Sequence, residues 1–334
     1  CDRRVRSRSM TRKHSISRCS AIDVRTAPLL LVALLLVSST QAVANSEDSS
    51  MWQDARIGVN GGTIGALVIP LSNETTYTEV SMNASDMYPV VEVYTATWCE
   101  NCVDTESALG EAIGDSDVMR IHYHRHWFES MDPFGNNATE ERWVSAYGEA
   151  STSVGGAPRV APTTVFDGER MHIGKVPSSS SLSNDYATSL STGQSSGLGG
   201  SPTNLSVMAY DPAEGVVMIS WDIGLYGPIG GCCLTLTPWL LFVEDSASFP
   251  EGTNGLENYL HVLHDAVELE ELEGTASVHV PPAWDDDDMS AVLIIDWSTE
   301  QAKSECCFRD LPGPGAVAAS LCLIVALLPS RRER

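Results

Sequence analysis

Two cysteines separated by two residues, Cys99 and Cys102, are the residues whose types and spacing most directly suggest chemistry. They stand in "TATWCENC" (95–102), directly after a tryptophan. Two thiols at this spacing can close a disulfide or exchange one with another molecule. They can also form half of a zinc site, but that needs a second pair of ligands at suitable spacing. No second CxxC pair follows, so the pattern favours a redox dithiol or a structural disulfide.

The segments on either side of the cysteines predict a strand followed by a helix. "PVVEVYTAT" (89–97) is rich in β-forming residues, and "NCVDTESALGEAI" (101–113) has apolar residues at helical spacing. Cys99 would then lie at the N-terminus of the helix, where free N–H groups and the helix dipole stabilise a thiolate. Cys102, one turn later, would be placed to resolve a mixed disulfide.

Histidines and aspartates give two weaker patterns. His122, His124 and His126 alternate in the predicted strand "VMRIHYHRHW" (118–127), so they would share one face and could bind a transition metal. Polar packing is the commoner role for such residues. "WDDDD" (284–288) lacks the spaced ligands and the glycine of a calcium loop, which favours a solvated loop. We therefore predict neither a metal nor a cofactor.

The cysteine segment and a later proline segment together resemble the thioredoxin-like superfamily. "VEVYTATWCENC" is similar to the strand, tryptophan and CxxC of that superfamily, and "VAPTTVFDG" (160–168) is similar to its cis-proline and following strand. The resemblance covers about 88–176 and is to secreted members of the superfamily. It implies that Cys99 is the attacking thiolate and Cys102 the resolving thiol. It also implies that Pro162 is a cis residue shaping the substrate edge.

Two departures from that resemblance affect the expected chemistry. Val93 stands where a buried aspartate is expected, so Glu92 is the predicted group for proton transfer to Cys102. Glu100 follows Cys99 directly, and a carboxylate beside a thiolate disfavours its ionisation. This predicts a site that is more reducing, or less reactive, than strongly oxidising dithiols.

The second half of the chain predicts a separate all-β domain. Residues 177–202 are rich in serine and glycine and predict a flexible linker. Alternating apolar residues such as Val217, Ile219 and Trp221 predict antiparallel strands and a β-sandwich over 203–304. This region resembles the β-rich C-terminal domain of some outer-membrane thioredoxin-like proteins. The predicted fold class is therefore an α/β thioredoxin-like domain, 88–176, followed by an all-β sandwich-like domain.

Four more cysteines form two adjacent doublets. We predict that they make structural cross-links, and a second redox pair is the alternative. The doublets are Cys232-Cys233 and Cys306-Cys307.

The ends of the sequence predict export and attachment to a membrane. Residues 1–44 read as a signal peptide, with basic residues before "APLLLVALLLV" (27–37) and cleavage predicted after Ala44. The alternative is a retained anchor, although the apolar run is short for a membrane span. A polar segment (45–87) follows. A tether (305–315) and an apolar tail ending in "RRER" (316–334) resemble a stop-transfer anchor or a C-terminal sorting tail.

Charge narrows the possible partners. The chain has a net charge of −24, and eleven of its 20 Lys and Arg residues lie in the two end segments. So acidic a central region repels nucleic acid. We predict an extracytoplasmic, cell-surface thiol–disulfide oxidoreductase, secreted or tethered through its tail. Its substrates would be the thiols or disulfides of other proteins, and its redox partner is unknown. The alternative is a non-enzymatic surface binding module with a structural disulfide.

Overall fold

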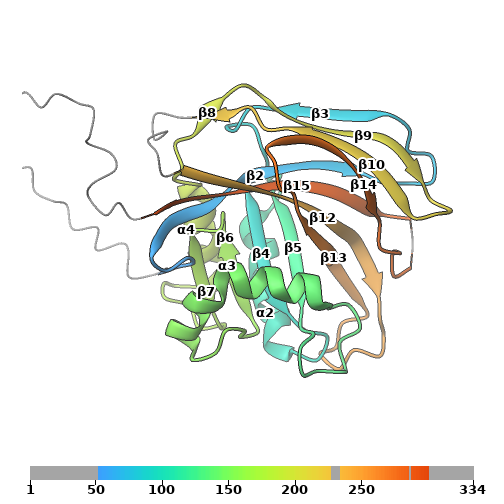
Figure 1. Ribbon diagram of the computed structural model, residues 1–334. Coiled ribbons are helices and arrows are strands. Elements are labelled where there is room, and N and C mark those ends of the chain that lie inside the picture. Colours follow the sequence, from blue (N-terminus) through green and yellow to red (C-terminus); the bar gives the residue numbers. More distant parts are fainter. Residues whose placement is uncertain (1–51, 227–233, 286, 301–334) are drawn as a thin grey trace, which may run out of the picture. The chain divides into compact units, whose positions relative to one another are not determined.

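The computed structural model describes residues 52–226, 234–285 and 287–300 (Figure 1). The expected signal peptide, tether and tail lie outside these residues, as do both cysteine doublets. The described part of the chain is rich in strands and has three helices: α2 (Glu100–Ile113), α3 (Asn137–Gly155) and α4 (Leu182–Thr192). None of these helices combines the length and the apolarity that crossing a membrane requires.

One mixed sheet of nine strands runs through the described residues, in the order β1-β7-β6-β4-β5-β13-β12-β15-β2 (Figure 1). β4 pairs in parallel with β5, and β5 pairs in parallel with β13. The other neighbours are antiparallel. The strands are β1 (Gln53–Asp54), β2 (Val59–Pro70), β4 (Val90–Thr95), β5 (Met119–His124), β6 (Thr163–Phe166), β7 (Arg170–Ile173), β12 (Leu234–Ser248), β13 (Asn258–Glu268) and β15 (Met289–Glu300).

Helices cover both faces of β4, and every residue of this strand is buried. Val91 and Val93 pack in one apolar cluster with residues of α2 and α4. Val90 and Tyr94 point to the opposite face and pack in a cluster with residues of α3. α3 begins at a capping box in which the side chain of Asn136 accepts the backbone N–H of Thr139.

A second, four-stranded antiparallel sheet has the order β14-β10-β9-β3. Its buried face shares an apolar core with the β2, β12 and β15 part of the large sheet, where Leu67, Phe242 and Leu293 lie with Leu205 and Ile219. Its strands are β3 (Thr78–Met82), β9 (Thr203–Asp211), β10 (Val216–Asp222) and β14 (Glu273–His279); a separate short pair joins β8 (Gly199–Gly200) to β11 (Leu225–Tyr226).

The predicted fold class, an α/β thioredoxin-like domain followed by an all-β sandwich-like domain, is wrong. β13, expected in the sandwich, pairs with β5, expected in the α/β domain, through Val262 and His122. The polar N-terminal segment supplies β2 and β3, one to each sheet. Local alternation predicts a strand but carries no information about a pairing partner that is distant in sequence. For that reason strands from both predicted domains lie side by side in the nine-stranded sheet, which the sequence did not indicate.

The segment 177–202 is not the flexible linker that its composition suggested, because it contains α4. Ser181 caps the helix by accepting the N–H of Asn184, and Leu182 and Tyr186, four residues apart, are buried. The carboxylate of Asp185 accepts the backbone N–H of Ser178 at 2.7 Å. Helical spacing of apolar residues decides the structure here, despite the many serines.

Candidate functional site

Cys99 and Cys102 form a disulfide at the start of α2. Cys99 is the N-cap residue of the helix, and Cys102 lies in its first turn. Cys99 is 6% exposed and Cys102 is fully buried. Ala96 is buried with them, and Trp98 and Ala161 pack against the pair. Both cysteines are therefore buried, and Cys99 is the more exposed of the two.

The Pro162 segment lies beside the disulfide. The Ala161–Pro162 peptide bond is cis, and Ala161 packs on the cysteine cluster. β6 begins directly after it, at Thr163. The structure thus brings together the loops that carry Cys99, Cys102 and Pro162, while the catalytic role of Pro162 stays a prediction.

Glu92 is not brought together with the cysteines. Its carboxylate accepts hydrogen bonds from the hydroxyls of Tyr123 and Tyr147, each at 2.5 Å, and pairs with Arg142 at 3.4 Å. These partners lie on the α3 side of the sheet, whereas Val93, the next residue, faces α2. Glu92 therefore has the contacts of a structural ion pair, and the placement does not support its predicted proton transfer to Cys102.

The ion pair of Glu92 extends into a buried network around Arg142. The Arg142 guanidinium donates to Asp296 at 3.0 Å and is shielded from solvent, since its side chain is 1% exposed. Arg56 contacts the other carboxylate oxygen of Asp296 at 2.9 Å. Burial alone would raise the pKa of Asp296, but Arg142 and Arg56 lower it to about 2. This network joins α3 to β15 and to the turn between β1 and β2.

Glu106 is a candidate that the sequence reasoning missed. It follows Cys102 by four residues on α2, so the two side chains share one helix face. Its carboxylate accepts the Thr95 hydroxyl at 2.7 Å and lies 4.0 Å from Nδ1 of His122. Burial raises the pKa of Glu106, although the Thr95 hydrogen bond opposes the shift. The four-residue spacing from Cys102 was the signal that could have identified it.

The three histidines do not form one row. His122 and His124 lie on β5 and are buried, but the strand ends there. The backbone N–H of His126 instead donates to Glu140 at 2.6 Å, which turns the chain away from the sheet. Burial lowers the pKa of His122, and His124 contacts Asp132 at 2.9 Å. Within the described residues, no group of three or more His, Cys, Asp or Glu side chains is arranged to hold a metal ion.

The connection between β12 and β13 supports the segment just before Cys99. The carbonyl oxygen of Thr97 accepts the backbone N–H of Thr253 at 3.0 Å and of Asn254 at 3.2 Å. It also accepts the hydroxyl of Tyr259 at 3.2 Å. A segment more than 150 residues away in the sequence thus fixes the backbone next to Trp98.

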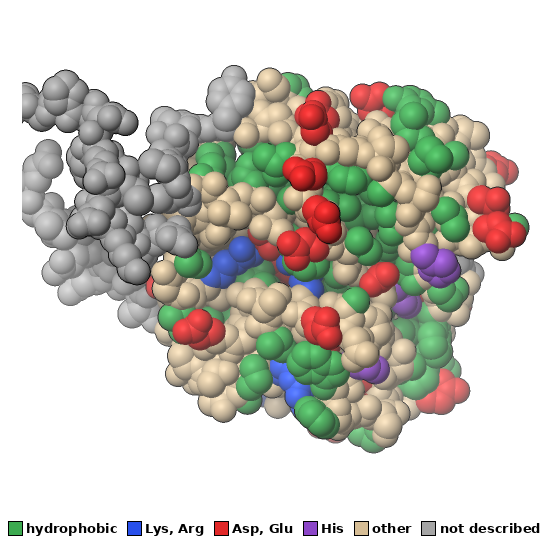
Figure 2. Space-filling model, viewed as in Figure 1, with side chains coloured by type: hydrophobic (Ala, Val, Ile, Leu, Met, Phe, Trp, Pro, Cys, Tyr) green, Lys and Arg blue, Asp and Glu red, His purple; other side chains and the backbone are tan. Residues whose placement is uncertain are grey.

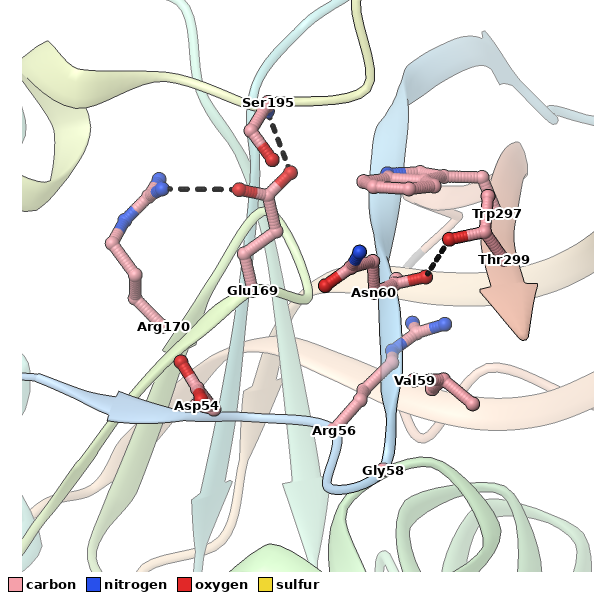
Figure 3. Close-up of a pocket in the computed structure, with 11 residues that line it drawn as sticks. Asp54, Arg56, Gly58, Val59, Asn60, Glu169, Arg170, Ser195, Trp297 and Thr299 are labelled. Carbon is pink, nitrogen blue, oxygen red and sulfur yellow. Dashed lines mark hydrogen bonds and ion pairs between the residues drawn. The ribbon is translucent and has the colours of Figure 1, made fainter. Parts of the chain in front are cut away.

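A polar cavity of about 520 Å³ lies where the two edges of the large sheet approach each other (Figure 3). The backbone N–H of Thr63 on β2 donates to the carbonyl of Asp167 at 2.6 Å nearby. In the cavity wall Glu169 lies between Arg170 and Ser195, accepting the Ser195 N–H at 2.6 Å and pairing with Arg170 at 3.3 Å (Figure 3). Glu169 and Arg170 are therefore paired with each other in the wall, and neither cysteine lines the cavity.

No protein-family model and no curated protein matches the sequence. Among solved structures, a structural-genomics protein from Agrobacterium tumefaciens is similar at 16% identity, covering 57% of this chain and 78% of its own, with a TM-score of 0.36. HBP35 of Porphyromonas gingivalis is similar at 18% identity, covering 64% of each chain, with a TM-score of 0.35.

The expected membership of the thioredoxin-like superfamily is therefore corrected. Neither similar structure supports it at this level of likeness, and the described residues form a β-rich structure with three helices. The expected likeness to outer-membrane thioredoxin-like proteins with a separate β-rich domain is wrong for the same reason. The disulfide and the residues around it are the features of this chain that indicate a function.

Proposed function

We propose that this protein is a thiol–disulfide oxidoreductase that exchanges the Cys99–Cys102 disulfide with thiols or disulfides of other proteins. The observation that carries the proposal is the unequal burial of the two cysteines at a helix N-terminus. An incoming thiolate can reach Cys99, while Cys102 is held inside as the leaving group. The N–H groups and dipole of α2 favour a thiolate at Cys99.

The exchange balances without any cofactor. A client thiolate attacks Sγ of Cys99, the Cys99–Cys102 bond breaks, and Cys102 leaves as a thiolate that takes up a proton. A second client thiolate then attacks the client sulfur of the mixed disulfide and releases Cys99. Two electrons and two protons pass from the client dithiol to the cysteine pair, and the reverse sequence reduces a client disulfide.

We assign to Glu106 the role of giving a proton to the Cys102 thiolate when the disulfide opens. It shares the helix face of Cys102, and its hydrogen bond from Thr95 holds it against the sheet. Burial raises its pKa, so it holds a proton to higher pH than an exposed glutamate does. Such a group can protonate a departing thiolate, directly or through a water molecule.

The proposed location is extracytoplasmic, with the protein secreted or tethered at the cell surface. The support is the sequence of the two end segments and the acidic composition of the chain between them. An intramolecular disulfide persists more readily in such an oxidising compartment than in a cytosol.

A Cys102→Ser variant tests the proposed activity. Without its resolving thiol, reduced Cys99 forms mixed disulfides that cannot collapse, so client proteins accumulate as adducts that dithiothreitol releases. A Cys99→Ser variant is the matched control and should form none through this pair, because Cys102 is buried. Equal adduct levels in the two variants, or none in either, would contradict the proposal.

The low exposure of Cys99 favours a second candidate, a non-enzymatic surface binding module in which the disulfide only holds the start of α2 in place. This candidate predicts a disulfide that resists reductants and no adducts with Cys102→Ser.

A further inference from the structure

Phe128 is the most exposed of the large apolar side chains in the described residues, at 98%. Its backbone also has φ 62°, a left-handed conformation that a bulky residue rarely adopts. The exposed ring gains no stability from burial, and the left-handed backbone costs stability. Their coincidence at one residue indicates a role other than folding.

The loop that presents Phe128, residues 125–132, is fixed by two carboxylates. Glu140 accepts the backbone N–H groups of His126 at 2.6 Å and Trp127 at 3.1 Å. Glu129 accepts the backbone N–H groups of Met131 at 2.5 Å and Asp132 at 2.9 Å. The position of Phe128 is therefore formed before any partner arrives.

One end of this loop lies against the residues that lead into Cys99. The indole Nε1 of Trp98 donates to Glu129 at 2.5 Å, and the hydroxyl of Thr97 donates to the carbonyl oxygen of Met131 at 3.3 Å. Met131 is itself 59% exposed. The loop that carries these exposed apolar side chains is thus hydrogen-bonded to the segment just before Cys99.

The middle of the same loop lies against the residues that lead into Pro162. The guanidinium of Arg159 lies 5.8 Å from the Phe128 ring and 5.5 Å from the Trp127 ring, and it donates to the Trp127 carbonyl at 3.1 Å. The loop is thereby fixed to both segments that lie beside the disulfide, while the ring of Phe128 stays exposed.

The exposed charges on the segments next to the disulfide include acidic ones, and the one arginine of the 125–132 loop, Arg125, lies over the Trp98 ring at 5.5 Å. Glu100 follows Cys99 and is exposed, and so is Glu251 in the 249–257 loop that supports Thr97. Arg159, by contrast, is paired with Glu140 at 3.2 Å. On the face in Figure 2, acidic side chains are widespread and basic ones form only small patches. A partner with positive charge complements this surface.

We propose that Phe128 and Met131 form a docking site for a cationic segment of a client polypeptide with an apolar side chain close to its cysteine. This inference rests on the proposed function and names its substrate class. The client side chain packs on Phe128, basic residues of the client face Glu100 and Glu251, and the client sulfur lies at Cys99. A small dithiol gains nothing from these contacts.

The test compares three short peptides, each with one cysteine, as reductants of the Cys99–Cys102 disulfide in the full chain. One carries Phe and two Lys residues beside the cysteine, the second has Ser in place of Phe, and the third has Glu in place of both Lys. Dithiothreitol serves as the small reductant. Mass spectrometry of acid-quenched samples gives the rate of mixed-disulfide formation or of reduction.

We expect the Phe-Lys peptide to react about tenfold faster than either altered peptide, in line with the selectivity of a single apolar contact. Phe128→Ala should remove the advantage of Phe while leaving the dithiothreitol rate unchanged. Met218→Ala, at an exposed position on β10, is the matched control and should change neither rate.

Equal rates for the three peptides, or an unchanged peptide preference in Phe128→Ala, would overturn the docking site while dithiothreitol still reacts. Failure of dithiothreitol itself to reduce the wild-type disulfide would overturn the proposed function and the docking site with it.

Discussion

Val262 of β13 pairs in parallel with His122 of β5, and this pairing joins two halves of the chain into one sheet. The two halves also share an apolar cluster on the α3 side of the sheet, where Leu241, Leu263 and Ile294 pack with Tyr123. The strands beside the disulfide thus depend on a segment more than 130 residues further along the chain.

A fragment of residues 88–176 should therefore fail to fold cooperatively. It would expose the edge of β5 and the apolar surface that β12, β13 and β15 cover. Urea denaturation followed by circular dichroism compares the fragment with the full chain, which should show a sigmoidal transition. A sigmoidal transition of similar steepness per residue in the fragment would contradict this dependence.

Glu106→Gln should slow the exchange of the Cys99–Cys102 disulfide by tenfold or more, since a positioned acid contributes about 10²–10⁴-fold to proton transfer. The variant keeps the shape of the side chain and can still accept the Thr95 hydroxyl. The pH profile of the rate should lose one ionisation. Glu111→Gln, at an exposed position on the same helix, is the control. An unchanged profile in Glu106→Gln would exclude the assigned role.

Glu92→Gln should lower stability without changing the chemistry. Removing the carboxylate leaves Arg142 with a weaker set of buried partners and disturbs the bonds from Tyr123 and Tyr147. Breaking a buried ion pair in this way costs about 3–5 kcal/mol in the free energy of unfolding. Urea denaturation measures the loss, with Glu149→Gln on the exposed side of α3 as the control. A slower exchange rate with unchanged stability would instead support the catalytic role first expected for Glu92.

Asp167 should make the protein less stable as the pH rises from about 4 to about 6. It is 3% exposed, and burial raises the pKa of Asp167 to about 6 in the folded state, although the bond from the Val90 N–H opposes the shift. An acid whose pKa is higher folded than unfolded stabilises the fold below the unfolded pKa, near 3.9, and loses that contribution as it ionises. The loss is roughly 2–3 kcal/mol by this linkage.

Asp167→Asn removes this ionisation. The side chain remains compatible with the left-handed backbone at this position, where φ is 48°. Denaturation at pH 4, 5, 6 and 7 should show a smaller decline for Asp167→Asn than for the wild type. Parallel curves for the two proteins would contradict the assignment.

Several local elements were predicted correctly from the sequence. The alternation of Val217, Ile219 and Trp221 identifies β10, and all three residues are buried. The apolar spacing after the cysteines identifies α2, and its start at Glu100 places Cys99 at the N-cap. Each of these features is encoded within about ten neighbouring residues, which is why the sequence reveals them.

The remaining features depend on contacts between distant segments. The pairing of β5 with β13 and the placement of β2 and β3 in different sheets have no local signal. Glu92 was expected near Cys102, but strand alternation turns it to the α3 face, where Tyr123 and Tyr147 are its partners. On the α2 side of the sheet the carboxylate is instead that of Glu106, which accepts the Thr95 hydroxyl.

The central claim is that the Cys99–Cys102 disulfide is a working redox pair, and its reduction potential tests this most directly. The full chain is equilibrated in glutathione or dithiothreitol buffers of defined potential, and alkylation followed by peptide mass spectrometry gives the free-thiol fraction at Cys99 and Cys102. We expect reversible reduction with a midpoint between about −200 and −280 mV, the range of cellular dithiol enzymes. Glu100 beside Cys99 disfavours a strongly oxidising value near about −120 mV. A pair that stays oxidised below about −300 mV, as structural disulfides do, would contradict the account.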